Sequence, residues 1–289
     1  MSKSEEIKAA LQKLSAEKSG LLRLVITEIV MLAIMLVLLF TVDIKAVYAA
    51  GAVTLIYNFL ILHPAKKRYL ANINRAECLL GVGANLQDCE YSLKDRLPKD
   101  LLEKACLVTP RTWPAEAVCR HRLRGKYAGA QVQISECSFA LKYGAANGAV
   151  AFISGSCIRA ELTEDAKQML CCMRRDVDYV SDGLPELECY GLSRCDFGSA
   201  KANETNLAYS ATGEIPEWLE KRFLKLSSTA PALLSLQGKE LVILLVSRFY
   251  APRHKVSDVL TEETLSFNRL PETAAALDII KIIQHKAAL

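Results

Sequence analysis

Two apolar stretches near the N-terminus decide the fold of this chain: LVITEIVMLAIMLVLLFTV at residues 24–42 and AVYAAGAVTLIYNFLIL at residues 46–62. The first stretch contains one charged residue, Glu28, and the second contains none. As α-helices they would extend about 28 Å and about 25 Å, close to the hydrocarbon thickness of a bilayer. A link at residues 43–45 separates them. The sequence therefore predicts a transmembrane helical hairpin over residues 21–62, with both open ends on one side of the membrane.

Basic residues flank the open ends of this hairpin, whereas the link has only Lys45. The flanking residues are Lys3, Lys8, Lys13, Lys18, Arg23, Lys66, Lys67, Arg68 and Arg75. Because positive loops stay inside, we expect a multi-pass protein of the cell inner membrane or plasma membrane with both termini in the cytoplasm. The alternatives are a signal peptide cleaved near Ala50-Gly51-Ala52 and a pair of buried helices of a soluble protein.

The ten cysteines agree with a cytoplasmic domain. They follow the second apolar stretch at irregular spacings, with no C-x-x-C pair, and several stand in apolar runs such as residues 169–173. Free cysteine packs like a small hydrophobic residue, and cytosolic thiols stay reduced. We interpret them as reduced core residues; a disulfide framework is the alternative if the domain faces outward.

The rest of the chain divides by pattern. Residues 1–20 are expected to form an amphipathic helix, with Ile7, Leu11 and Leu14 on one stripe and Gly20 at its end. This helix either lies on the membrane or in a coiled coil, or extends the first span. A basic juxtamembrane segment at residues 63–76 then leads into a cytoplasmic domain at residues 77–289.

Short apolar and alternating segments predict the elements of that domain. We expect helices at residues 98–107, 216–226 and 271–286, and strands at residues 124–134, 137–143, 149–153, 169–173, 232–236 and 241–247. Asn147-Gly148 and residues 237–240 predict hairpin turns. Since the strands come as hairpins, the expected class is α+β with an antiparallel sheet and packed helices.

Three segments carry a resemblance to a known family. They are RLRGKYAGAQVQISECSFAL at residues 122–141, FGSAKANETNLAYSATGEIPEWLEKRFLKL at residues 197–226, and LLSLQGKELVILLV at residues 233–246. With the preceding hairpin, they resemble a bacterial membrane-anchored family known only as domain of unknown function 3137. The resemblance covers about residues 20–285 and departs at residues 151–157, where the family has an aromatic-glycine-aromatic strand. It implies a cytosolic domain with no established activity, and a LemA-type helical membrane protein as a partner.

Three polar residues lie within the apolar stretches. Glu28 is expected to reach lipid headgroups or to pair with Arg23 or Lys18, while Thr54 and Asn58 are expected to hydrogen-bond to the first helix. The alternative is an ion or proton path, which two helices could line only as part of an oligomeric channel or transporter.

The most distinctive charged segment is the basic run at residues 120–126. On a regular strand, Arg120, Arg122, Arg124 and Lys126 would share one face. With Lys66, Lys67 and Arg68, they are candidates for contact with anionic lipid or an acidic partner. The formal net charge of +4 is too small to indicate nucleic-acid binding.

Metal and catalytic patterns are weak. Cys119, His121, Cys189 and Cys195 are candidate zinc ligands, but their spacing differs from that of usual zinc sites. Residues 154–157, of sequence SGSC, could form a tight turn, with no base nearby in sequence. We therefore expect no cofactor.

The leading hypothesis is a membrane-tethered, non-enzymatic interaction or scaffold protein that binds a protein partner, itself or anionic lipid. The alternatives are a membrane-bound Cys/His-dependent or metal-dependent hydrolase and a subunit of an oligomeric channel or transporter.

Overall fold

The computed structural model of the chain describes residues 3–41, 44–95, 113–142, 150–166, 169–176, 191–249, 254–266 and 271–287. Its contacts divide the chain into two compact units. The first, called the hairpin unit, contains residues 1–80 and 252–267. The second, called the sheet unit, contains residues 81–251 and 268–289. The chain therefore crosses between the units three times.

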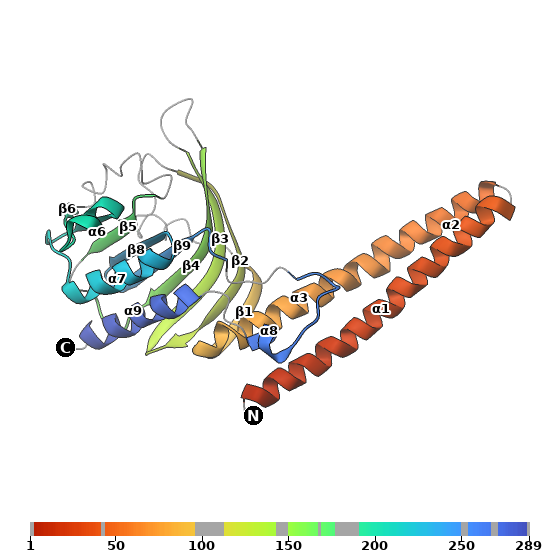
Figure 1. Ribbon diagram of the computed structural model, residues 1–289, viewed down its shortest axis with the longest axis horizontal. Coiled ribbons are helices and arrows are strands. Elements are labelled where there is room, and N and C mark those ends of the chain that lie inside the picture. The colour runs from red at the N-terminus through yellow and green to blue at the C-terminus, as the bar shows by residue number, and fades with distance from the viewer. Residues whose placement is uncertain are drawn as a thin grey trace. The chain divides into compact units, whose positions relative to one another are not determined.

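Long helices build the hairpin unit (Figure 1). Helix α1 spans Lys3–Thr41 and α2 spans Ile44–Tyr57. A π-helical turn, η1, at Asn58–Leu62 joins α2 directly to α3 at His63–Leu80, and the short α8 follows much later at Glu262–Ser266. Since α1 packs against α2, η1 and α3, the two long helical runs form an antiparallel hairpin.

One half of this hairpin has a core of its own. Every seventh residue at the start of α1 is buried, namely Ile7, Leu14 and Leu21. The rest of the core comes from η1, α3 and α8 and consists of Leu62, Tyr69, Ile73 and Leu265. A seven-residue apolar repeat is the pattern by which helices pack along a narrow seam. We call this part the base of the hairpin.

The expected helix end at Gly20 was wrong, because α1 continues to Thr41. A glycine inside a helix costs only about 1 kcal/mol relative to alanine, and the buried seam passes from Leu14 to Leu21 across it. The N-terminal helix is therefore an extension of the first apolar helix. Likewise, the juxtamembrane segment at residues 63–76 is part of α3.

The sheet unit contains nine strands in the described residues, in the order β1-β2-β3-β4-β9-β8-β5-β7-β6, and each recorded neighbouring pair is antiparallel. Their bounds are β1 Gln87–Asp95, β2 Trp113–Tyr127, β3 Ala130–Lys142, β4 Val150–Glu161, β5 Leu170–Arg174, β6 Ser193–Cys195, β7 Asn206–Ser210, β8 Ala232–Gln237 and β9 Glu240–Val246. Together with its helices, this sheet confirms the α+β class.

Two amphipathic helices pack on the sheet (Figure 1). Helix α7, at Glu217–Thr229, contacts β5 and β8, and α9, at Pro271–Ala287, contacts β2 and β9. The two helices also contact each other. Phe223 of α7 is fully buried and stacks on Phe197, with ring centroids 6.0 Å apart. Two short elements, 3₁₀-helix η2 at Gly83–Asn85 and α6 at Ala200–Thr205, complete the unit.

Several predicted elements are confirmed. The segments around residues 237–240 form the β8–β9 hairpin, residues 170–174 form strand β5 between β7 and β8, and the last two helices are α7 and α9. Strands β3 and β4 pair as expected, whereas the Asn147-Gly148 turn lies outside the described residues. The helix expected at residues 98–107 also lies outside them.

The single strand expected at residues 124–134 was wrong, because a tight turn divides it into β2 and β3. Ala128 and Gly129 form this turn with φ angles of 49° and 88°. Positive φ at both central residues gives the turn a twist that matches paired strands. Alanine rarely adopts this conformation, so Ala128 concealed the turn from the sequence pattern.

Gly155 lies within strand β4, and the tight turn expected at residues 154–157 was wrong. Gly155 pairs with Cys137 on one side and with Val246 on the other. A Cβ atom at this position would lie 2.0 Å from the backbone oxygen of Leu245. Only glycine therefore lets β4 and β9 approach at this point.

We expect Gly155→Ala to lower the free energy of unfolding of the sheet unit by about 1–3 kcal/mol, because the backbones of β4 and β9 must separate. Urea denaturation of the detergent-solubilised protein measures this change. Gly198→Ala is the matched control, since its Cβ would meet only the flexible carboxylate of Glu220, at 3.3 Å. Equal stability of the two variants would contradict the close packing at Gly155.

Candidate functional site

Beyond the base, the two long helices carry apolar side chains that no described part of the protein covers. The exposed large apolar residues are Leu22, Ile26, Ile29, Val30, Leu32, Ile34, Leu36, Val37, Leu39, Phe40, Ile44, Tyr48, Val53, Leu55, Ile56, Phe59, Leu60 and Ile61. Both helical runs are long and apolar enough to cross a membrane, and only 0% and 6% of their most apolar windows are buried. The core helix of a soluble protein would be mostly buried, so this part indicates membrane association.

A polar pair joins the two helices within this apolar part. Glu28 follows Ile7, Leu14 and Leu21 at the same seven-residue spacing, and its Oε1 accepts a hydrogen bond from Nδ2 of Asn58. One residue before Asn58, the hydroxyl of Tyr57 donates to the backbone oxygen of Leu24 at 2.9 Å. Two hydrogen bonds thus cross between the helices at one level.

Thr54 behaves differently from the expectation. Its hydroxyl donates to the backbone oxygen of Ala50, at 2.9 Å, within its own helix. The nearby Asn58 begins the π-helical turn η1. Such turns occur in α-helices mostly as single insertions and are frequent at functional sites. The polar pair and the irregular turn therefore coincide at one point of the hairpin.

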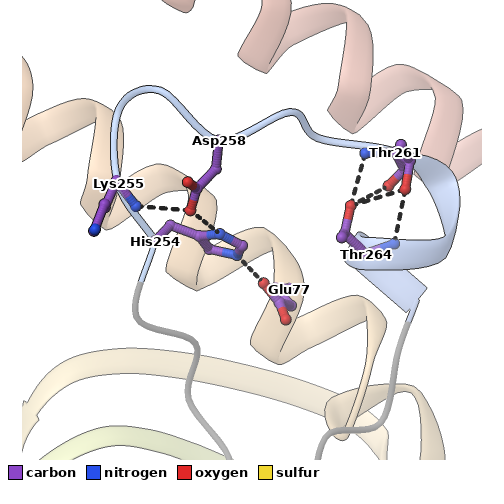
Figure 2. A network of polar contacts seen from close by, with 6 residues as sticks. All are labelled: Glu77, His254, Lys255, Asp258, Thr261 and Thr264. Carbon is purple, nitrogen blue, oxygen red and sulfur yellow. Dashed lines mark hydrogen bonds and ion pairs between the residues drawn. The ribbon is translucent and has the colours of Figure 1, made fainter.

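A second polar cluster lies in the hairpin unit, where α3 meets residues 254–266. Figure 2 shows the imidazole of His254 between two carboxylates, Glu77 on α3 and Asp258 four residues further along the chain. His254 Nε2 contacts Glu77 Oε2, and Nδ1 lies 3.3 Å from Asp258 Oδ2. The side chains of His254 and Glu77 are only 5% and 2% exposed.

Further hydrogen bonds surround this cluster. The backbone N–H of Lys255 donates to Asp258 Oδ2 at 2.8 Å, and Lys18 Nζ of α1 donates to the backbone oxygen of Asp258 at 2.8 Å. The Lys255 N–H, and to a smaller extent the imidazole of His254, lower the pKa of Asp258. No pattern in the sequence linked Glu77 to His254, its partner 177 residues away.

The basic residues predicted as contacts occupy two places. Lys67 and Arg68 are exposed at the start of α3, and Lys66 is partly buried there. The other group lies on β2, where Arg120, Arg124 and Lys126 are exposed and Arg122 is partly buried.

A β-bulge interrupts the alternation of β2 between Arg120 and Leu123, with His121 at a positive φ of 53°. Nδ1 of His121 lies 2.8 Å from the hydroxyl of Tyr91. Burial, followed by the charge of Arg120, lowers the pKa of His121, so the ring is neutral near pH 7. The regular row of basic side chains on β2 is thus broken at its centre.

The candidate zinc ligands that the structure describes do not converge. In the part of the chain that the structure describes, no three His, Cys, Asp or Glu side chains are grouped to hold a metal ion. Cys119 on β2 and Cys137 on β3 are register neighbours in the sheet, and both are free thiols. Cys195 lies on β6, and Cys189 is outside the described residues. Cys119 is only 2% exposed, which disfavours it as a nucleophile.

Other cysteines pack like apolar residues. Seven of the eight described cysteines are buried. A hydrogen bond with Cys157, together with burial, raises the pKa of Cys137 well above its usual value. Such thiols are structural.

These features define an α+β protein with two candidate membrane-spanning helices. No family model and no curated protein sequence matches the chain. Among solved structures, the chain is similar to the mycobacterial trehalose monomycolate transport factor A, TtfA, with 11% sequence identity and a TM-score of 0.33. The match covers 73% of this chain and 95% of that one.

We expect Asn58→Leu to destabilise the hairpin by about 1–3 kcal/mol, because it leaves an acceptor of Glu28 facing apolar surroundings. Replacing both partners with apolar groups removes this penalty, so the double variant Glu28→Leu/Asn58→Leu should be close to the wild-type protein. Glu28→Gln should also be tolerated, since its amide oxygen can still accept. Unfolding by increasing dodecyl sulfate in mild-detergent micelles, followed by circular dichroism, measures these differences. A double variant as unstable as Asn58→Leu would contradict the pairing.

Proposed function

We propose that this chain is an integral membrane protein whose hairpin tethers the sheet unit as a non-enzymatic interaction module. One observation carries the proposal: along a single helix, α1, the seam residues are buried up to Leu21, whereas large apolar side chains are exposed from Leu22 to Phe40. Apolar surface of this extent is unfavourable in water and favourable in hydrocarbon. A bilayer is therefore the solvent that fits the part of the hairpin beyond its base, which carries the exposed apolar residues between Leu22 and Ile61.

Helical backbone supports the same proposal. In hydrocarbon, every backbone N–H and C=O must be satisfied within the segment, which α-helices achieve. Helix α1 remains helical up to Thr41, and the second run resumes at Ile44. Its polar side chains Thr54, Tyr57 and Asn58 donate to partners inside the hairpin. These three side chains are thus satisfied within the hairpin.

Charge supports a cytoplasmic position for both open ends. Arg23 is exposed one residue after the apolar surface begins on α1, and Lys67 and Arg68 are exposed shortly after it ends at Ile61. We call these three residues the basic collar. At the opposite end of the hairpin, the basic residue is Lys45. Positive residues stay on the cytoplasmic side and attract anionic headgroups of that leaflet.

Binding partners follow as part of the proposal. The basic collar favours anionic lipid as one ligand of the anchor. The resemblance to domain of unknown function 3137 suggests a LemA-type membrane protein as a protein partner, and a second copy of the chain is the alternative.

We expect a cysteine at position 44 to react with a membrane-impermeant maleimide in intact cells, and a cysteine at position 4 to react only after permeabilisation. Ile44 is 60% exposed and lies at the closed end of the hairpin, whereas Ser4 is exposed near the N-terminus. The unsubstituted chain supplies the background from native cysteines. Labelling of position 4 in intact cells would overturn the proposed orientation.

We expect Lys67→Ala/Arg68→Ala to reduce the anionic lipid that co-purifies with the protein by at least half, because two cations near the headgroups are removed. Native mass spectrometry of the protein released from mild detergent measures the bound lipid. Lys8→Ala/Lys13→Ala is the matched control, since both lysines are exposed but lie about 15–22 Å along α1 from Arg23. An equal loss in both variants would show a nonspecific charge effect and contradict the collar.

A further inference from the structure

One segment of the hairpin unit is separated from the rest of it in the sequence. Residues 254–266, which we call the strap, follow strand β9 and precede helix α9, yet they belong to the hairpin unit. Leu265 of the strap is fully buried in the core of the base, and Val256 and Leu260 pack against the same core. The strap is therefore packed onto the base at several points.

A tight turn lies near the start of the strap. His254 contacts Glu77 of α3, and directly after it the backbone N–H of Asp258 donates to the backbone oxygen of Lys255 at 3.2 Å. The backbone N–H of Lys255 in turn donates to the side chain of Asp258 at 2.8 Å. Figure 2 shows Lys255 and Asp258 on the two sides of this turn. The strap thus reverses its direction at residues 255–258.

Contacts with both long helical runs fix the level of this turn along the hairpin. From α1, Lys18 Nζ donates to the backbone oxygen of Asp258 at 2.8 Å. On α3, burial, followed by the charges of Glu17 and Asp258, raises the pKa of Tyr69, so Asp258 lies near that residue as well. Tyr69 is about 12 Å along α3 from Glu77, in the direction of the apolar part of the hairpin. The turn is therefore closer to that apolar part than the start of the strap is.

This level is where lipid headgroups are expected. Lys18 is about 6 Å along α1 from Leu22, at which the exposed apolar surface begins. Tyr69 is about 12 Å along α3 from Ile61, at which that surface ends, and it directly follows Arg68 of the basic collar. A headgroup layer extends roughly 5–8 Å beyond the hydrocarbon on each side of a bilayer. The turn therefore lies beside the basic collar, at or just below the headgroups.

The exposed side chains of the turn suit such a surface. Val259, directly after the turn, is 77% exposed, whereas the other exposed large apolar side chains in the described part of the hairpin unit all lie on the two long helical runs. Lys255, on the other side of the turn, is also exposed. The exposed acidic residues of the strap, Glu262 and Glu263, begin α8, which lies further from α2 (Figure 1). Apolar side chains accompanied by cations bind the interface of anionic membranes.

We propose that the turn of the strap is a third point of contact with the membrane, at which Val259 inserts among the lipid headgroups and Lys255 pairs with anionic ones. This contact rests on the membrane anchor proposed above. The chain enters the strap from β9 and leaves it toward α9. The sheet unit is then linked to the membrane surface by the strap as well as by α3.

Quenching of tryptophan fluorescence by brominated lipid tests this contact. The full-length protein is placed in nanodiscs of phosphatidylcholine brominated in its acyl chains, mixed with phosphatidylglycerol, and the wild-type protein supplies the background of its two tryptophans. We expect Val259→Trp to be quenched at least twice as strongly as Glu263→Trp, which replaces an exposed residue of α8 on the same strap. Both variants carry the same indole, so its own preference for the interface does not explain a difference. Equal quenching at the two positions, or none at position 259, would overturn the proposal.

Leu36→Trp separates a failure of this contact from a failure of the anchor. Leu36 is 57% exposed in the apolar part of α1, so brominated lipid should quench an indole there strongly. Strong quenching at position 36 without quenching at position 259 would overturn the contact of the strap and leave the anchor standing. No quenching at position 36 would overturn both.

Discussion

The structure of the hairpin depends on one seven-residue seam along α1. Along this seam, Ile7, Leu14 and Leu21 build a core against η1, α3 and α8, and Glu28 occupies the next position. The seam thus keeps the same helices together while the surface around them changes from charged to apolar at Leu22. A continuous helix can pass through such a change of surface, because its backbone hydrogen bonds are made within the helix whatever surrounds it.

Two polar contacts add specificity to the packing of the hairpin unit. The Glu28–Asn58 pair lies in the apolar half, and the Glu77–His254 pair lies in the base. Apolar seams tolerate sliding between helices, whereas a polar group at a core position is costly unless it meets its partner. The Glu28–Asn58 pair therefore selects one register of the two long helices, and the Glu77–His254 pair selects the place where residues 254–266 meet α3.

Sequence patterns predicted the helices and strands that have a regular apolar spacing, and they missed individual residues at turns, bulges and long-range contacts. The length of the apolar stretches identified the two candidate membrane helices. Amphipathic spacing identified α7 and α9, and the pattern of two apolar runs around a turn identified the β8–β9 hairpin. They failed at Ala128 and His121, whose left-handed backbones depend on tertiary pairing. They also failed at Glu77 and His254. The residues around each of them form no pattern that indicates the contact, and the two are 177 residues apart in the sequence. Polar pairs between distant segments are fixed by topology, which periodicity does not encode.

Residues 254–266 complete the core of the hairpin unit. Residues 1–80 supply most of its helices, but Leu265 fills its core and His254 meets Glu77 only after the strands up to β9 have been made. Before that point, the core of the base lacks Leu265, and the contact between His254 and Glu77 has not been made. The base of the hairpin therefore reaches its final packing only after the strands up to β9 have been synthesised, and α9 of the sheet unit follows later still. Completion of the hairpin base thus depends on a segment that follows the strands of the sheet unit in the sequence.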